Sequence, residues 1–198
     1  MPCNPFRRKK SVAPKQQSKV SDDTFVDNGR TLHVYVESWK QRQATIFDDD
    51  KETVLYNIDI RNRRPNLTFR NGNDVQVGTI AFNPWNRAIT ANIQNTDISV
   101  KSKNWKTCNL LYTSKAFGGQ QLEWQRQTPW VVLDHFLVDE HKMPIAKISP
   151  REWAKKKYAV IELVDPNLPQ EAIDEVVMIG LAVFQNTKYY TAVNAGSS

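Results

Sequence analysis

Most of the chain alternates between apolar and polar residues with a period of two, which is the pattern of a half-buried β-strand. The alternation begins at Arg30, after which Leu32 and Val34 would lie on one face and His33 and Tyr35 on the other. The same pattern recurs in residues 53–60, 75–82, 88–93, 104–113, 120–126, 130–138, 143–149 and 158–164. The pattern therefore predicts a mainly β protein.

The breaks between these segments have the composition of tight turns. They include the three aspartates 48–50, the stretch 70–74 (RNGND), the Gly118-Gly119 pair and residues 139–142 (DEHK). Short connections between consecutive strands favour antiparallel hairpins, so we expect an antiparallel sheet.

One segment near the C-terminal end of the sequence is helical in character. Residues 168–185 (LPQEAIDEVVMIGLAVFQ) contain nine consecutive residues without a polar side chain, from Val176 to Phe184. Asn167 and Gln170 have the spacing of a capping box, and Asn186 with Lys188 would close the other end. A surface helix keeps a polar side, so this helix is expected to be buried all round.

Such a helix constrains the fold of the strands. Burying its eight large apolar side chains would contribute on the order of 12–24 kcal/mol before opposing terms. In a small β domain, the inside of a closed sheet of about ten strands covers a helix on every side. We therefore predict a closed antiparallel β-barrel around a central hydrophobic C-terminal α-helix. The alternative is a helix held between a sheet and long loops.

Composition divides the chain into a basic arm and a neutral body. The 198 residues, 40% hydrophobic, suffice for one domain. The net charge of +6 comes from the first twenty residues, which contain six basic and no acidic residues, while the remainder has 21 of each sign. We expect a disordered basic arm at 1–28, a barrel domain at 29–187 that includes the helix 168–185, and a tail at 188–198. A neutral body argues against nucleic acid as a partner.

The cysteine count and the apolar runs indicate a cytoplasmic protein. Cys3 and Cys108 are too few for a disulfide framework, and the N-terminal residues lack the apolar region of a secretory signal. The longest apolar run covers only about 13 Å of helix, against a bilayer core of about 30 Å. No transmembrane span is therefore predicted.

Four segments resemble the tubby C-terminal-like superfamily, which includes the tubby, LURP-one-related and phospholipid scramblase families. They are residues 67–82 (LTFRNGNDVQVGTIAF), 117–127 (FGGQQLEWQRQ), 137–149 (LVDEHKMPIAKIS) and 161–185 (IELVDPNLPQEAIDEVVMIGLAVFQ). The resemblance, closest to small uncharacterised fungal members, covers about residues 30–187 and implies a β-barrel around a hydrophobic helix. Tubby-like members bind phosphoinositides and scramblase-like members act at membranes. No phosphoinositide signature can be transferred position by position.

The arm is the first candidate membrane-binding element. A cysteine beside a basic run can accept an acyl chain, and each basic residue adds about 1 kcal/mol of attraction to an anionic leaflet. The residues concerned are Cys3, Arg7, Arg8, Lys9 and Lys10. The alternative is a solvated basic arm or a nuclear-localisation-like run with an idle cysteine.

The second candidate is an anion-binding surface on the body. Its residues fall into two groups: Arg61, Arg63, Arg64 and Arg70 cluster around the junction of two strands, and Lys101, Lys103 and Lys106 form a second group. Arginine can hold phosphate oxygens bidentately, and lysine can hold them as a point charge. The same residues would also be explained as solvated edge positions that discourage strand pairing.

The sequence contains no recognisable catalytic or metal-binding motif. His33, His135 and His141 have neither the close mutual spacing nor the cysteine cluster of a metal site. The aspartates at 48–50 lack the order of a calcium loop, and there is no phosphate-binding loop or nucleophile elbow. The six tryptophans are expected to pack in the core and at the rim of the sheet rather than to stack on bases or sugars. We therefore expect no metal, no cofactor and no enzymatic activity.

These observations lead to a hypothesis with two alternatives. The hypothesis is a non-enzymatic tubby-like binding or adaptor module at anionic, phosphoinositide-containing membrane surfaces, cytoplasmic or peripheral to a membrane. The first alternative is a soluble barrel that binds an unidentified protein partner without a membrane role, in the cytoplasm or the nucleus. The second is an undetected enzyme or ligand carrier, which would need an open pocket with convergent polar groups beside the helix.

Overall fold

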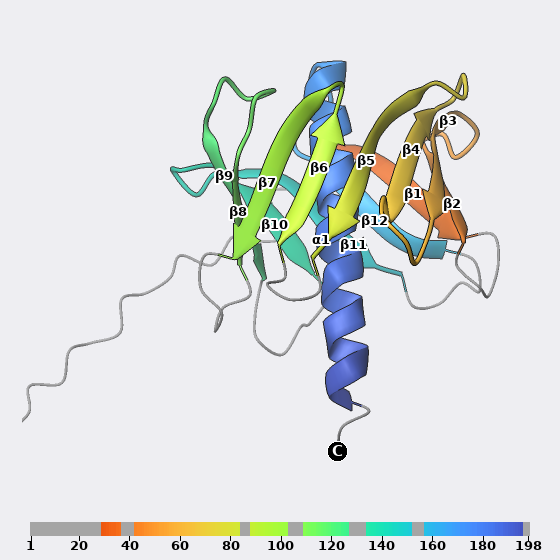
Figure 1. The fold of residues 1–198 in the computed structure, drawn as a ribbon. Coiled ribbons are helices and arrows are strands. Elements are labelled where there is room, and N and C mark those ends of the chain that lie inside the picture. The colour runs from red at the N-terminus through yellow and green to blue at the C-terminus, as the bar shows by residue number, and fades with distance from the viewer. Residues whose placement is uncertain are drawn as a thin grey trace, which may run out of the picture.

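The computed structural model describes residues 29–36, 42–83, 88–102, 109–126, 134–151 and 157–195, and in the last range it describes the side chains of residues 158–187. These residues form twelve strands and one helix, α1 (Gln170–Ala195) (Figure 1). The strands are β1 (Arg30–Val36), β2 (Gln43–Phe47), β3 (Val54–Ile60), β4 (Leu67–Asn71), β5 (Gln76–Phe82), β6 (Ile89–Ile93), β7 (Thr96–Ser102), β8 (Leu110–Thr113), β9 (Gln121–Arg126), β10 (His135–Val138), β11 (Pro144–Pro150) and β12 (Lys157–Leu163).

The strands form one closed barrel in which sequence neighbours are also neighbours in space. Each strand pairs antiparallel with the strands before and after it, and β1 pairs with β12 to close the sheet. The predicted closed antiparallel barrel is therefore confirmed. Three strands, β2, β4 and β7, were absent from the strand prediction, so the barrel has twelve strands where about ten were expected.

Helix α1 occupies the centre of the barrel. Every residue from Ala172 to Phe184 is buried, so the helix is covered on all sides, as its apolar circumference predicted. Inward-facing side chains of all twelve strands join those of the helix in one core, which includes Leu32, Phe69 and Trp124.

The close fit of helix and wall requires glycine at two positions. A Cβ at Gly180 would lie 2.9 Å from the indole ring of Trp124 on β9. A Cβ at Gly78 on β5 would overlap the carbonyl oxygen of Asn92 and lie 2.8 Å from the Cε of Met178. Glycine therefore lets the helix approach the wall more closely than any other residue would allow.

The predicted ends of the helix were wrong. The helix begins at Gln170, and its first intrahelical acceptor is the carbonyl of Pro169, which receives N–H groups from Ala172 and Ile173. Asn167 instead donates its backbone N–H to the carboxylate of Asp165, so the capping box does not form. At the other end the helix continues past Asn186 and Lys188 to Ala195.

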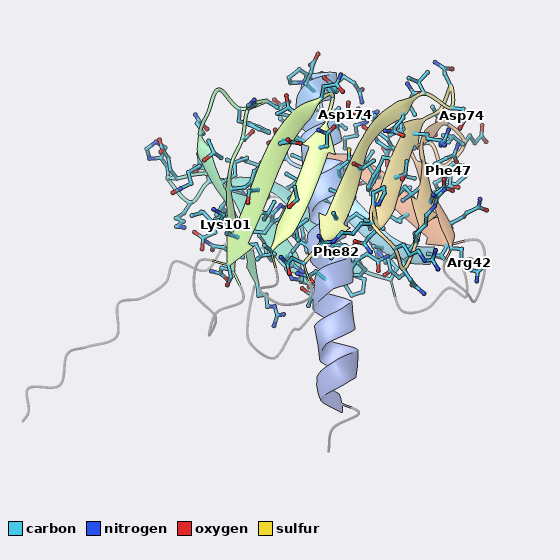
Figure 2. The ribbon with its side chains drawn as sticks, viewed as in Figure 1. Arg42, Phe47, Asp74, Phe82, Lys101 and Asp174 are labelled. Carbon is cyan, nitrogen blue, oxygen red and sulfur yellow. The ribbon has the colours of Figure 1, made fainter. Side chains whose placement is uncertain are left out.

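The helix gives the barrel two distinct ends. Its N-terminus lies at the end closed by residues 48–53, 72–75, 94–95, 114–120, 139–143 and 164–169, which we call the entry end. Its C-terminal turns project beyond the strands at the opposite end, which we call the exit end (Figure 1). Arg42, Phe82 and Lys101 lie toward the exit end, and Asp74 and Asp174 lie toward the entry end (Figure 2).

Candidate functional site

Charge is segregated between the two ends of the barrel. The six connections at the entry end, all of them described, contain eight acidic and three basic residues. The acidic residues are Asp48, Asp49, Asp50, Glu52, Asp74, Asp139, Glu140 and Asp165, and the basic residues are Lys51, Lys115 and Lys142. The entry end is therefore an acidic surface.

The described residues at the exit end have the opposite charge. We define the basic rim as the exposed cations at or next to the strand ends there: Arg42, Arg61, Arg63, Arg64, Lys101 and Arg151. The described acids near this end are Asp59 and Asp134, and both are partly buried. The rim therefore presents an excess of positive charge to solvent.

Backbone hydrogen bonds bring part of the rim together. Ile60 donates its N–H to the carbonyl of Arg42 at 2.7 Å, which places Arg42 beside the start of the β3–β4 connection. Arg61 follows Ile60 directly, and its side chain is 61% exposed with the guanidinium 3.6 Å from Asp59. Four arginines, at positions 42, 61, 63 and 64, therefore lie on two adjoining segments.

The connection that contains three of these arginines is held by Asn66. The carbonyl of Asn66 accepts the N–H of Arg61 at 2.8 Å, and its side-chain oxygen accepts the N–H of Phe82 at 2.9 Å. Arg64 also donates from Nη2 to the carbonyl of Phe82 at 3.0 Å. This connection is thus tied to β5 and presents its arginines from a fixed backbone.

The structure describes five of the seven body residues predicted from the sequence, and it separates the four arginines of the first group. Arg61, Arg63 and Arg64 lie together in the β3–β4 connection at the exit end. Lys101 lies toward the same end but on β7, which β5 and β6 separate from β4 (Figure 2). Arg70 was wrongly grouped with the other arginines, because β4 carries it toward the entry end, where its guanidinium lies 3.6 Å from Asp74. Lys103 and Lys106 lie outside the described residues, as do Cys3, Arg7, Arg8, Lys9 and Lys10.

Two rim residues were missed in the sequence. Arg42 immediately precedes β2, and Arg151 immediately follows β11. Neither arginine has another basic residue beside it among the described residues, so the local density of charge does not indicate a binding site there. The signal is their position at strand ends, which requires the strand assignment, including the missed β2.

The mouth of the barrel at the entry end contains a buried polar network. The Asp174 carboxylate accepts hydrogen bonds from the hydroxyl of Tyr56 at 2.5 Å, from Gln170 at 2.7 Å and from Gln94 at 2.8 Å. Burial, then the Asp174 carboxylate, raises the pKa of Tyr56 well above its ordinary range. These bonds join the first helical turns to β3 and to the β6–β7 turn, which fixes the position of the helix along the barrel.

Glu175 forms the second contact between helix and wall. Its Oε2 accepts the N–H of Ala116 at 3.3 Å, in the β8–β9 connection. Burial, and next the Glu175 carboxylate, hold the pKa of Tyr112 on β8 well above its ordinary range, although the two side chains do not meet hydrogen-bond geometry. The β8–β9 connection is thus drawn toward the helix.

A groove with a volume of about 440 Å³ lies along β7, β8 and β9. The residues that line it include the exposed Asp97, Ser99, Lys101 and Thr113. It follows the line between β7 and β8, so it differs from the pocket beside the helix that an enzyme or carrier would need.

Metal-binding geometry is absent from the described residues, where no three histidine, cysteine, aspartate or glutamate side chains gather. His135 is buried with its Nε2 3.1 Å from the hydroxyl of Thr187, whereas His141 is exposed at the entry end. In the described part of the chain, no helix is both long and apolar enough to cross a bilayer.

Comparison with known proteins finds no family profile, no curated protein and no solved structure that matches the chain.

Proposed function

We propose that this protein is a non-enzymatic binding module that docks the exit end of its barrel on an anionic membrane surface. The observation that carries the proposal is the basic rim, which lies at one end of a barrel whose other end is acidic. An anionic surface attracts the rim and repels the entry end, so one orientation is favoured. The tubby-like resemblance of residues 67–82 and 161–185 supports the same class of ligand.

The expected strength of this docking is modest. Each basic residue near an anionic leaflet contributes about 1 kcal/mol. Arg42, Arg61, Arg63 and Arg64 together would thus contribute about 4 kcal/mol, equivalent to a dissociation constant of about 1 mM. Stable binding needs a second signal. The basic arm, with Cys3 as an acylation site, is our proposal for that signal.

The sequence between the described strand ends adds further support. Five stretches of sequence outside the described residues each contain one tryptophan: Trp39, Trp85, Trp105, Trp130 and Trp153. In the sequence, each stretch falls between two strands whose adjoining described ends are at the exit end. Tryptophan is enriched in proteins at the level of lipid headgroups. The sixth, Trp124, is buried against Gly180 in the core. Packing, which the sequence predicts for all six tryptophans, is confirmed for Trp124.

Co-sedimentation with vesicles tests the proposal through charge-matched variants of the full chain. The pair Arg42→Gln with Arg63→Gln removes two charges from the exit end, and the pair Lys51→Gln with Lys115→Gln removes two from the entry end. On phosphatidylserine and phosphoinositide vesicles we expect the first pair to weaken binding about 30-fold, from about 2 kcal/mol, and the second pair to have little effect.

The two variants have the same net charge, so a nonspecific effect of charge would weaken the vesicle binding of both equally. That result would contradict docking through the exit end. Neutral vesicles provide the baseline, and phosphatidylserine against phosphoinositide vesicles separates general charge from headgroup preference. If the unmodified chain binds no anionic vesicle at low salt, the membrane role fails. A soluble barrel with a protein partner then becomes the better description, and the β7–β8 groove is the feature that favours it.

A further inference from the structure

The barrel wall is incompletely paired between β7 and β8. β7 pairs with β6 at five successive positions, from Thr96 to Val100, but among the residues that the structure describes it pairs with β8 only at Lys101 and Ser102. Continuing the register would pair Ser99 with Thr113, and this pair does not form. The two strands therefore meet at the exit end and diverge toward the entry end, which leaves an edge inside a closed barrel (Figure 1).

The direction of the backbone groups along this edge follows from the β6–β7 turn. Gln94 and Asn95 both have positive φ, 48° and 63°, and form a two-residue turn, so Ile93 and Thr96 are a hydrogen-bonded pair. Backbone groups alternate sides along a strand, so Thr96, Ile98 and Val100 bond to β6. Asp97 and Ser99 consequently direct their N–H and C=O groups toward β8, where they have no ladder partner.

The divergence has a cause in the β8–β9 connection. Ala116 in this connection donates to Glu175 of α1, and Phe117 packs against the core and donates its N–H to the buried hydroxyl of Ser114. These contacts hold the end of β8 near the helix, while β7 continues along β6. The contacts that fix the helix thus keep the edge of β7 at Asp97 and Ser99 unpaired with β8. We call this unpaired stretch between β7 and β8 the seam.

We propose that this seam is a binding site for an extended peptide segment of a partner protein, which adds to the β7 edge as a strand. A free edge recognises main-chain hydrogen bonds, and the adjacent side chains supply specificity. The groove of about 440 Å³ along the seam provides the space. Lys101 and Lys115 line it against one acid, Asp97, so the segment is acidic. The membrane proposal uses other residues, apart from Lys101, which belongs to both the basic rim and the groove.

Amide hydrogen exchange on the full chain tests the free seam directly. We expect the amides of Asp97 and Ser99 to exchange at least ~10-fold faster than those of Ile98 and Val100, because only the latter two are bonded within the barrel. Equal protection of all four amides would mean that the seam is closed in solution, and the proposal would be overturned.

The binding test uses a displayed library of random heptapeptides panned against the full chain. Enriched peptides are expected to contain acidic residues and to slow exchange at Asp97 and Ser99 when added in synthetic form. The same peptide N-methylated at alternate residues retains its side chains but loses backbone donors, and we expect it to bind at least ~10-fold more weakly. Failure to enrich any peptide, or equal binding of the methylated form, would overturn strand addition.

A matched pair of protein variants separates the backbone of the seam from its side chains. Ser99→Pro removes an N–H that no ladder bond to β6 uses, whereas Ser99→Ala keeps it. We expect a loss of at least ~10-fold in peptide affinity for the proline variant and less than ~2-fold for the alanine variant. Equal losses would overturn the proposal. So would a dimer of the chain that Ser99→Pro converts to monomer, because a second copy would then occupy the seam.

Discussion

At the scale of single residues, Gly180 shows how closely the barrel wall encloses its helix. Alanine in place of a mid-helix glycine ordinarily stabilises by about 1 kcal/mol. Here the added methyl group would lie 2.9 Å from the buried ring of Trp124, and overpacking of this kind costs about 1–3 kcal/mol. We therefore expect Gly180→Ala to lower the free energy of unfolding, by about 1 kcal/mol, in urea denaturation.

The partner residue supplies the control. In a Trp124→Phe background the smaller ring leaves room for the methyl group, so Gly180→Ala should be neutral or stabilising there, and the double-mutant cycle should give a coupling of at least about 1 kcal/mol. Stabilisation by Gly180→Ala in the parent chain would contradict the close contact.

At the scale of elements, one ion pair joins the first strand to the connection after the second. Arg30 donates from Nε and Nη2 to the two carboxylate oxygens of Asp48, at 2.8 and 2.6 Å. The hydrogen bonds from Arg30 lower the pKa of Asp48 below its usual value of about 3.9. Because the folded pKa is the lower one, the stabilisation is complete above about pH 4–5 and is lost as pH falls through the folded pKa.

The prediction is a pH-dependent loss of stability in Asp48→Asn. The pair is partly exposed, so we expect a loss of only about 0.5–1 kcal/mol at pH 7, which should diminish as the pH is lowered below about 4. Free energies of unfolding measured from pH 7 to pH 3 would check it. Asp49→Asn, at the neighbouring exposed position, should change little over this range. A deficit that stays constant with pH would argue against the ion pair as its source.

The elements also differ in how far the sequence predicts them. The helix and its central position were predictable because nine apolar residues on all faces leave few places to bury it. β7 was missed because it has only two buried apolar residues, Ile98 and Val100, and because the Gln94-Asn95 turn before it has positive φ without glycine. The end of the helix was placed too early because polar residues after Phe184 resemble a stop, whereas the backbone continues as a helix beyond the barrel.

Prediction of the candidate site was limited by the missed strands, because the strand assignment decides at which end of the barrel a cation lies. The arginines at 61, 63 and 64 are adjacent in the sequence and remain together in the structure. Arg70 lies only six residues after Arg64, but five-residue β4 separates the two ends of the barrel. Whether a cation belongs to the rim depends on the direction of its strand, and strand direction alternates along the chain. A single missed strand therefore assigns all later residues to the wrong end of the barrel.

At the scale of the whole molecule, the two basic features are attached to opposite ends. The arm joins the barrel at β1, which begins at the acidic entry end, while the rim lies at the exit end. A fully extended chain of 28 residues spans at most about 92–101 Å. A seven-residue strand is about 23 Å long, so the arm is long enough to contact the same surface as the rim. A membrane bound through both would lie beneath the exit end.

Orientation on the membrane is therefore the property that tests this arrangement most directly. Asn62 and Asn73 are exposed at the exit and entry ends, and each can be replaced by cysteine in a chain lacking Cys3 and Cys108 and labelled with an environment-sensitive fluorophore. On anionic vesicles the label at 62 should shift to the blue and be quenched by nitroxide lipids, while the label at 73 should not respond. The blue shift and the quenching of the label at 62 should both disappear near 1 M salt, where the Debye length is about 3 Å. Equal responses at the two ends would mean binding without orientation, and a response only at 73 would reverse the arrangement.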